Sequence, residues 1–207
     1  MRLALLATFA LIPTVAHADD DPRQPRSLAM TAPTAGETPC ARLIDPDPNN
    51  KPPVCRAIAT RKVRGLGTAT LWRTDDGYEQ HFAIAVTSGA TTTITERITI
   101  TSNGCGMGKC ENLDKVKPTL VATSVDGHPA IGLDLAANYS MSYNDPPHTG
   151  DRWTVHTFAL CGTAGSGAAA CATASFGARG GSCKASLDGN GVIHASCDET
   201  VPMSLVR

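Results

Sequence analysis

The stretch TLVATSVDGHPAIGLDL, residues 119–135, gives the clearest indication of the fold. Two β-prone runs flank Asp126-Gly127, and Asp-Gly is one of the preferred pairs for the two-residue turn of a β-hairpin. With the turn at this pair, the facing residues are Leu120 with Leu133 and Ala122 with Ile131. All four side chains then share one apolar face, so the stretch predicts an antiparallel hairpin packed against a core.

The same pattern occurs earlier in the chain, in residues 68–86, TATLWRTDDGYEQHFAIAV. Here Asp76-Gly77 separates two β-prone runs. A turn at this pair predicts that Leu71 faces Phe82 and that Ala69 faces Ile84. A second turn at Ser88-Gly89 leads into residues 90–102, where three isoleucines occupy positions of one parity: Ile94, Ile98 and Ile100. That spacing predicts one half-buried strand.

CKASLDGNGVIHASC, residues 183–197, permits two interpretations. A calcium loop of the EF-hand type needs a bidentate acid at its twelfth position, where Cys197 stands when Asp188 and Asn190 are aligned as ligands. A hairpin with the loop Gly189-Asn190-Gly191 fits better. Its facing pairs are Leu187 with Ile193, Ala185 with Ala195, and Cys183 with Cys197.

These hairpins recur at short spacing, residues 152–160 and 172–177 add further strands, and no segment shows a helical period. We therefore predict an all-β antiparallel sandwich of about eight or nine strands over residues 58–207, stabilised by disulfides. Residues 19–57 are rich in proline and have no apolar period, which predicts a tail or linker.

Residues 1–18 have the features of an export signal. Arg2 precedes an apolar run from Leu3 to Val15, and Ala16-His17-Ala18 has the small residues of a cleavage site. The run is shorter than the roughly 20 residues of a membrane-spanning helix, and no later segment is longer. We expect cleavage near Ala18 and a secreted or periplasmic chain with no transmembrane segment.

The chain has eight cysteines, an even number that suits disulfides in an oxidising compartment. Pairing neighbours in sequence is the simplest framework: 40–55, 105–110, 161–171 and 183–197. Cys105 and Cys110 lack the further cysteines of an iron–sulfur motif, and no histidine pair has zinc-site spacing, so we expect no metal and no cofactor.

A formal net charge of −1 argues against a nucleic-acid partner. The basic run formed by Arg56, Arg61, Lys62 and Arg64 is better explained as a solvated strand edge than as an anion site.

No catalytic signature is assembled in the sequence. Ser166 lies between glycines, but alanines occupy the outer positions of a nucleophile elbow, so no catalytic residue is assigned. The loop around His148, with Asp145 and Asp151 nearby, is the best place for polar chemistry, although a plain turn explains it as well.

One further candidate for binding is the pair Trp72 and His81, which face each other if Asp76-Gly77 is the turn. An exposed aromatic pair on a sheet suits a glycan or a peptide, whereas the same pair on a covered face is core. With His148, these residues are the predicted binding residues.

The leading hypothesis for the function is a binding or structural module of the cell envelope, with a glycan, a peptide or an envelope protein as its partner. A secreted hydrolase with a site assembled from loops and a self-assembling surface subunit are the alternatives.

Overall fold

The computed structural model describes residues 25–44, 53–77, 79–101, 103–106, 109–143, 150–163, 169–177, 183–196 and 200–202, with the backbone alone for 103–106 and 200–202. These ranges are nearly all antiparallel β-structure, with fifteen strands and one short helix. The prediction of an antiparallel all-β class is confirmed. The expected number of strands was too low, because several strands of two to five residues have no recognisable period in the sequence.

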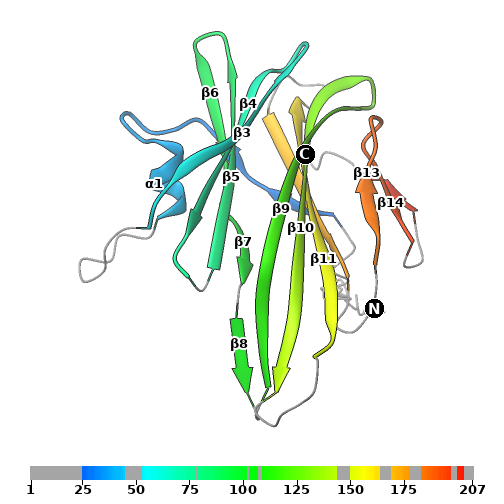
Figure 1. The fold of residues 1–207 in the computed structure, drawn as a ribbon. Coiled ribbons are helices and arrows are strands. Elements are labelled where there is room, and N and C mark those ends of the chain that lie inside the picture. The colour runs from blue at the N-terminus through cyan, green and yellow to red at the C-terminus, as the bar shows by residue number, and fades with distance from the viewer. Residues whose placement is uncertain are drawn as a thin grey trace, which may run out of the picture.

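The strands form three sheets (Figure 1). Sheet A has the order β1 (Arg26–Leu28), β12 (Ala169–Phe176), β11 (Arg152–Thr163), β10 (His128–Tyr143), β9 (Lys109–Val125) and β8 (Asn103–Gly106). Sheet B has the order β2 (Met30–Thr31), β6 (Thr91–Thr95), β5 (Glu79–Ser88), β4 (Gly67–Asp75) and β3 (Arg56–Val63), with β7 (Ile98–Thr101) also paired to β5. Sheet C has β13 (Ala185–Leu187), β14 (Val192–Ala195) and β15 (Thr200–Pro202).

Sheets A and B pack face to face as a sandwich. The core between them takes alternate residues from both sheets, such as Leu71, Phe82 and Ile84 from sheet B and Ile131 and Leu133 from sheet A. These five side chains are fully buried. The alternation arises because successive side chains of a strand point to opposite faces.

Two smaller layers cover the outer faces. The helix α1 (Pro39–Leu43) packs on sheet B, where Leu43 joins Ala83, Ala85 and Ile94 in a buried cluster. Sheet C packs on the outer face of sheet A through an apolar cluster. That cluster includes Phe158, Leu160 and Phe176 from sheet A and Leu187 and Ile193 from sheet C. Figure 1 shows the resulting order of layers as α1, sheet B, sheet A and sheet C.

Two of the predicted hairpins have the expected register. Leu120 pairs with Leu133 and Ala122 with Ile131, around a turn in which Asp126 and Gly127 have φ values of 50° and 76°. Leu187 pairs with Ile193 and Ala185 with Ala195. Cys197, the expected partner of Cys183, lies outside the described residues.

The register predicted for residues 68–86 was wrong by two residues. Leu71 pairs with Ile84 and Ala69 with Val86, because the last pair before the turn is Asp75 with Gln80. The Asp76 amide donates to the Glu79 carbonyl and the Asp76 carboxylate accepts from the Glu79 amide, so the centre of the turn lies one residue further along the chain than expected. The apolar face is unchanged, since a shift by two keeps the parity of every side chain.

The three isoleucines of residues 90–102 do not share a face, which corrects the prediction of one strand. Ile94 pairs with Ala85 and lies in the cluster under α1, whereas Ile98 pairs with Phe82 and lies in the core between the sheets. The chain between β6 and β7 contains one residue more than the part of β5 that it faces. Like a β-bulge, this extra residue moves the following side chains to the opposite face of the sheet. The Thr95 hydroxyl accepts a hydrogen bond from the Ile84 amide at 3.0 Å, which holds the bulge.

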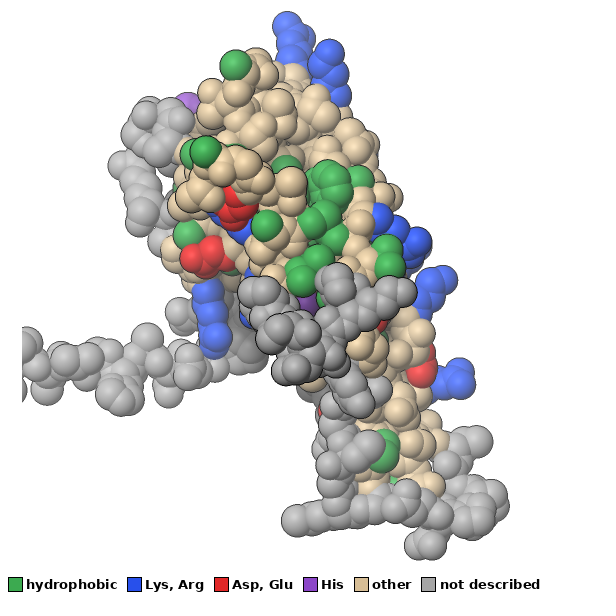
Figure 2. All heavy atoms as spheres, turned by 90° about the vertical axis from the view of Figure 1, so that its left-hand side faces the viewer, with side chains coloured by type: hydrophobic (Ala, Val, Ile, Leu, Met, Phe, Trp, Pro, Cys, Tyr) green, Lys and Arg blue, Asp and Glu red, His purple; other side chains and the backbone are tan. Residues whose placement is uncertain are grey.

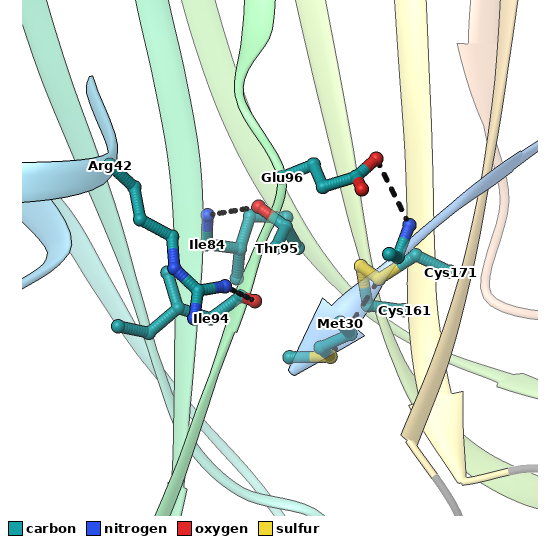
Figure 3. Close-up of a disulfide and its surroundings, with 9 residues drawn as sticks. Met30, Arg42, Ile84, Ile94, Thr95, Glu96, Cys161 and Cys171 are labelled. Atoms are coloured by element: carbon teal, nitrogen blue, oxygen red, sulfur yellow. Dashed lines mark hydrogen bonds between the residues drawn. A yellow bond between two sulfur atoms is a disulfide. The ribbon is translucent and has the colours of Figure 1, made fainter. Parts of the chain in front are cut away.

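The predicted N-terminal tail is in part a structural element. Strand β1 pairs with β12 at the edge of sheet A, and β2 pairs with β6 at the edge of sheet B, so residues 26–31 bridge one open edge of the sandwich (Figure 3). We call this segment the strap. The Glu96 amide donates to the Ala29 carbonyl at 2.9 Å, at the crossing between the sheets. The sequence of the strap shows no alternation of apolar and polar residues. Its strands form because the edge strands β12 and β6 supply hydrogen-bond partners for its backbone.

The disulfides Cys40–Cys55 and Cys161–Cys171 are confirmed. The first ties α1 to the residue before β3, and the second joins directly paired positions of β11 and β12. Cys110 and Cys183 are also disulfide-bonded, but the side chains of Cys105 and Cys197 lie outside the described residues. Disulfides fit a secreted or periplasmic protein. In the described part of the chain no helix is long and apolar enough to cross a membrane.

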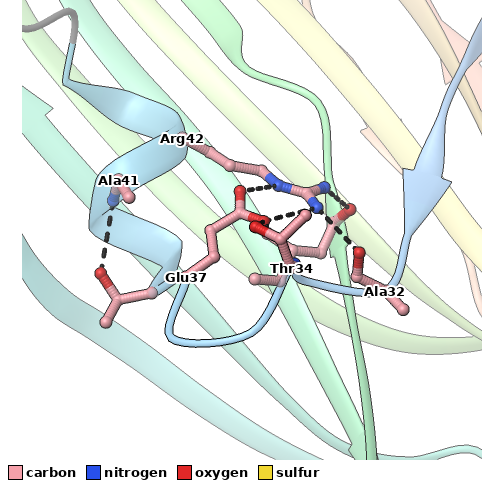
Figure 4. Close-up of polar contacts among 7 residues, drawn as sticks. Ala32, Thr34, Glu37, Ala41 and Arg42 are labelled. Carbon is pink, nitrogen blue, oxygen red and sulfur yellow. Dashed lines mark hydrogen bonds and ion pairs between the residues drawn. The ribbon is translucent and has the colours of Figure 1, made fainter.

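Arg42 fastens α1 to Ala32, the residue that follows the strap, and to sheet B (Figure 4). Its Nε lies 2.7 Å from Glu37 Oε1, its Nη1 donates to the Ile94 carbonyl at 2.6 Å, and its Nη2 donates to the Ala32 carbonyl at 3.2 Å. The three nitrogens of one planar guanidinium reach three separate acceptors, whereas a lysine has all of its donors on one nitrogen.

The Glu37–Arg42 pair predicts a pH-dependent part of the stability. The hydrogen bond from Arg42 lowers the pKa of Glu37 from 4.5 to about 2. Because the folded-state pKa lies below the unfolded value, this contribution is complete above about 4.5 and is lost as the pH falls through about 2. We expect Glu37→Gln to flatten the fall in melting temperature across this window. Arg42→Met should remove the same part of the slope, and the double variant should match either single one; an unchanged slope in Glu37→Gln would contradict the prediction.

Candidate functional site

The predicted binding pair Trp72 and His81 does not form an exposed aromatic surface. In the observed register Trp72 pairs with Ala83, and His81 pairs with Thr74. Trp72 is half-buried against the cluster under α1, and His81 is 5% exposed. Helix α1 covers this face of sheet B, so the pair is better described as part of a covered face than as an exposed binding surface. The third predicted residue, His148, and its neighbour Asp145 lie outside the described residues.

A cleft opens instead between the two large sheets, beside the strap. Its volume is about 270 Å³. The lining residues come from four strands and the residue before β7: Arg26, Leu28, Arg97, Ile98, Thr99, Thr157, Thr173, Ala174 and Ser175. The strap therefore forms part of the cleft, and the site exists only when residues 26–28 are paired to β12.

Hydroxyl groups replace apolar side chains where the inner face of sheet A reaches this cleft. Ala159, Cys161 and Cys171 on this face belong to the core, whereas the next residues of the same parity are Thr157, Thr173 and Ser175. The Thr157 and Ser175 hydroxyls lie 3.1 Å apart and hydrogen bond to each other. A row of hydroxyls on the inner face of a sandwich is unusual for a packed core and offers both donors and acceptors to a ligand.

The cleft is positively charged. Arg26 and Arg97 line it, and the described residues of its lining include no acidic one. Arg26 stands opposite Thr173 in the pairing of β1 with β12, and Arg97 precedes β7. Guanidinium groups bind carboxylates and phosphates through paired hydrogen bonds, so the cleft suits a small anion that also carries hydroxyl groups.

In the last hairpin both carboxylate oxygens of Asp188 already have hydrogen-bond partners within the hairpin. Its Oδ1 accepts from the amides of Asn190 and Val192 at 2.8 and 3.0 Å, and its Oδ2 lies 2.8 Å from His194 Nε2. These contacts, with His194 the largest, lower the pKa of Asp188. Both oxygens serve the three-residue loop, in which Gly191 has a φ of 75°. The geometry fits the hairpin interpretation.

A second His–Asp pair, His156 with Asp134, is half-buried in a structural environment. His156 Nδ1 lies 2.9 Å from Asp134 Oδ1, between the neighbouring strands β11 and β10. The imidazole stacks on Phe158 with ring centroids 5.8 Å apart. Because Phe158 belongs to the core under sheet C, this pair lies at the border of that core, as expected for a boundary histidine.

The basic run lies on the edge strand of sheet B. Arg56, Arg61 and Lys62 are exposed on β3, and Arg64 is exposed in the turn that follows. The Arg61 guanidinium donates to the Leu120 carbonyl of sheet A at 3.2 Å. Lysines and arginines gather at the top and along one margin of the face that Figure 2 shows. Charged side chains on an edge strand prevent pairing with other chains, which explains the run without a ligand.

Three residue types that bind metals meet at the end of the β4–β5 hairpin: Asp76, Glu79 and His81. Sequence spacing did not reveal this group, since only Glu79 and His81, two residues apart on one strand, share a face by parity. The cleft was also missed, because its residues come from segments about 70 residues apart along the chain.

Comparisons with protein families, with curated proteins and with solved structures found no match to this chain. Its function therefore has to follow from the chemistry of its own residues.

Proposed function

We propose that this protein is an exported binding module that takes a small hydroxylated anion, such as a uronic acid, in the cleft between sheets A and B. The observation that carries the proposal is the combination of Arg26 and Arg97 with the hydroxyls of Thr157, Thr173 and Ser175 around one opening. The two guanidinium groups match a carboxylate, and the hydroxyls match those of a sugar ring.

The size of the cleft supports a small ligand. Its volume of about 270 Å³ is at the lower end of ligand pockets, which fits one sugar unit better than a long chain. Leu28 and Ile98 add apolar surface that can contact the carbon-bearing face of a ring. Polar groups at the rim with an apolar floor are the usual arrangement for such sites.

The test is isothermal titration of the oxidised, tag-free chain with glucuronate, glucose and acetate. Glucuronate should bind most tightly, because only this ligand combines the carboxylate with the hydroxyls. Arg97→Gln should weaken glucuronate binding about tenfold or more, since a hydrogen bond to a charged group contributes roughly 1.5–3 kcal/mol.

Arg64→Gln is the matched control, because Arg64 is an exposed arginine outside the cleft. It should leave glucuronate binding unchanged. Equal binding of glucose and glucuronate, or equal affinities for wild type and Arg97→Gln, would contradict the proposed site.

The alternative of a hydrolase is a prediction that depends on Asp145 and His148, which lie outside the described residues. The third residue of that group, Asp151, is exposed and its carbonyl accepts from the Met141 amide at 2.9 Å. No observation favours this alternative over the cleft.

A further inference from the structure

We propose that Asp76, Glu79 and His81 form a binding site for one Zn²⁺ ion at the end of the β4–β5 hairpin. Their ligand atoms all lie within 4.8 Å of one another. His81 Nε2 lies 3.7 Å from Asp76 Oδ2 and 3.7 Å from Glu79 Oε2. Metal–ligand bonds of about 2.0–2.2 Å in a tetrahedral zinc site place neighbouring ligands roughly 3.3–3.5 Å apart, so only a small adjustment is needed.

His81 is oriented as a metal ligand. Its side chain is 7% exposed, and its Nδ1 lies 3.1 Å from the Thr99 hydroxyl on the neighbouring strand β7. Metal-binding histidines almost always use the second ring nitrogen in such a hydrogen bond, which fixes the tautomer and the ring orientation. With Nδ1–H donated to Thr99, the lone pair of Nε2 faces the two carboxylates. A metal cation bound to Nε2 there would contact both carboxylates.

The carboxylates are placed by the same turn that sets the register. Asp76 Oδ1 accepts from the Glu79 amide at 2.7 Å, which leaves Oδ2 on the side of His81. Asp76 and Glu79 are 41% and 40% exposed, so a metal ion can enter from solvent and keep a water in its fourth position. One imidazole and two carboxylates are a ligand set that zinc accepts.

A separate observation points to the same place. The Thr74 hydroxyl is buried and has no hydrogen-bond partner among the described residues, and Thr74 is 0% exposed. Thr74 pairs directly with His81, so both side chains are on one face of sheet B. A buried polar atom without a partner is rare in native proteins and often marks an ion or a water that completes the site. The metal site is a separate proposal from the cleft, although Thr99, which contacts His81, also lines the cleft.

The test uses the oxidised, tag-free chain, stripped with EDTA and titrated with Zn²⁺, Ca²⁺ and Mg²⁺ by calorimetry and by thermal shift. We expect one equivalent of Zn²⁺ to bind and to raise the melting temperature, with much weaker binding of Ca²⁺ and Mg²⁺, because an imidazole ligand disfavours these hard cations. His81→Gln and Glu79→Gln should each weaken Zn²⁺ binding at least about tenfold.

His194→Gln is the matched control, since His194 also lies against a carboxylate, Asp188, but forms no group of three metal-binding residues within the described part of the chain. It should bind Zn²⁺ as the wild type does. Glu79 is partly exposed, so Glu79→Gln keeps the test decisive if His81→Gln fails to fold. No binding of Zn²⁺ at millimolar concentration, equal affinity in Glu79→Gln, or equal affinity for Ca²⁺ would overturn the proposal.

Discussion

Gly67→Ala is expected to lower the free energy of unfolding by about 3–5 kcal/mol, combining backbone strain with overpacking. Gly67 has a φ of +124°, a conformation that residues with a side chain rarely adopt. An added Cβ would lie 2.2 Å from the Thr87 carbonyl oxygen and 2.9 Å from its carbon. Since β4 begins at Gly67 and pairs with β5 there, relief of this clash would separate two central strands of sheet B. Urea unfolding followed by circular dichroism measures the loss.

Gly89→Ala is the control for backbone strain alone. Gly89 has a φ of +59°, and an added Cβ meets nothing within 4 Å. We expect a loss of about 1–2 kcal/mol for this variant, the cost of the left-handed conformation. Equal losses for the two variants would show that close approach of β5 contributes nothing at Gly67.

Phe158→Ala is the second change with a large expected effect, a loss of about 3–5 kcal/mol. Phe158 is 0% exposed and contacts Phe176 edge to face, with ring centroids 5.9 Å apart. It lies in the cluster between sheet A and sheet C. Truncation leaves a cavity there, because the strands on either side are held by their own ladders and cannot close it.

Urea unfolding gives the size of this effect, and amide hydrogen exchange shows where it acts. Strands β13 and β14 should lose protection more than β9 and β10, since sheet C depends on this cluster for its attachment. Val54→Ala is the control, because Val54 is 75% exposed and its truncation should change stability by less than about 0.5 kcal/mol. If Phe158→Ala lowered the free energy of unfolding as little as Val54→Ala does, the attachment of sheet C would not depend on the Phe158 side chain.

The hairpins show which registers can be predicted from sequence. Asp126-Gly127 and the loop at Gly189–Gly191 were assigned correctly, because their residue types fix the turn and the apolar residues fix the face. At Asp76-Gly77 the same signal predicted the hairpin and its face but not its register. The amide and the carboxylate of Asp76 both bond to Glu79, which moves the centre of the turn by one residue, and propensity alone does not reveal such contacts.

Sequence by itself determined the antiparallel β class, the apolar faces of the main hairpins, and the disulfides Cys40–Cys55 and Cys161–Cys171, since each depends on residues close together along the chain. Tertiary structure alone decided the strap, the cover of α1 over Trp72, the cleft, and the grouping of Asp76 and Glu79 with a buried His81. The strap, the cover of α1, the cleft and the burial of His81 arise where strand edges and sheet faces from distant segments meet. Local periodicity carries no information about which distant edge a segment will pair with, because that choice depends on which hydrogen-bonding groups the rest of the fold leaves open.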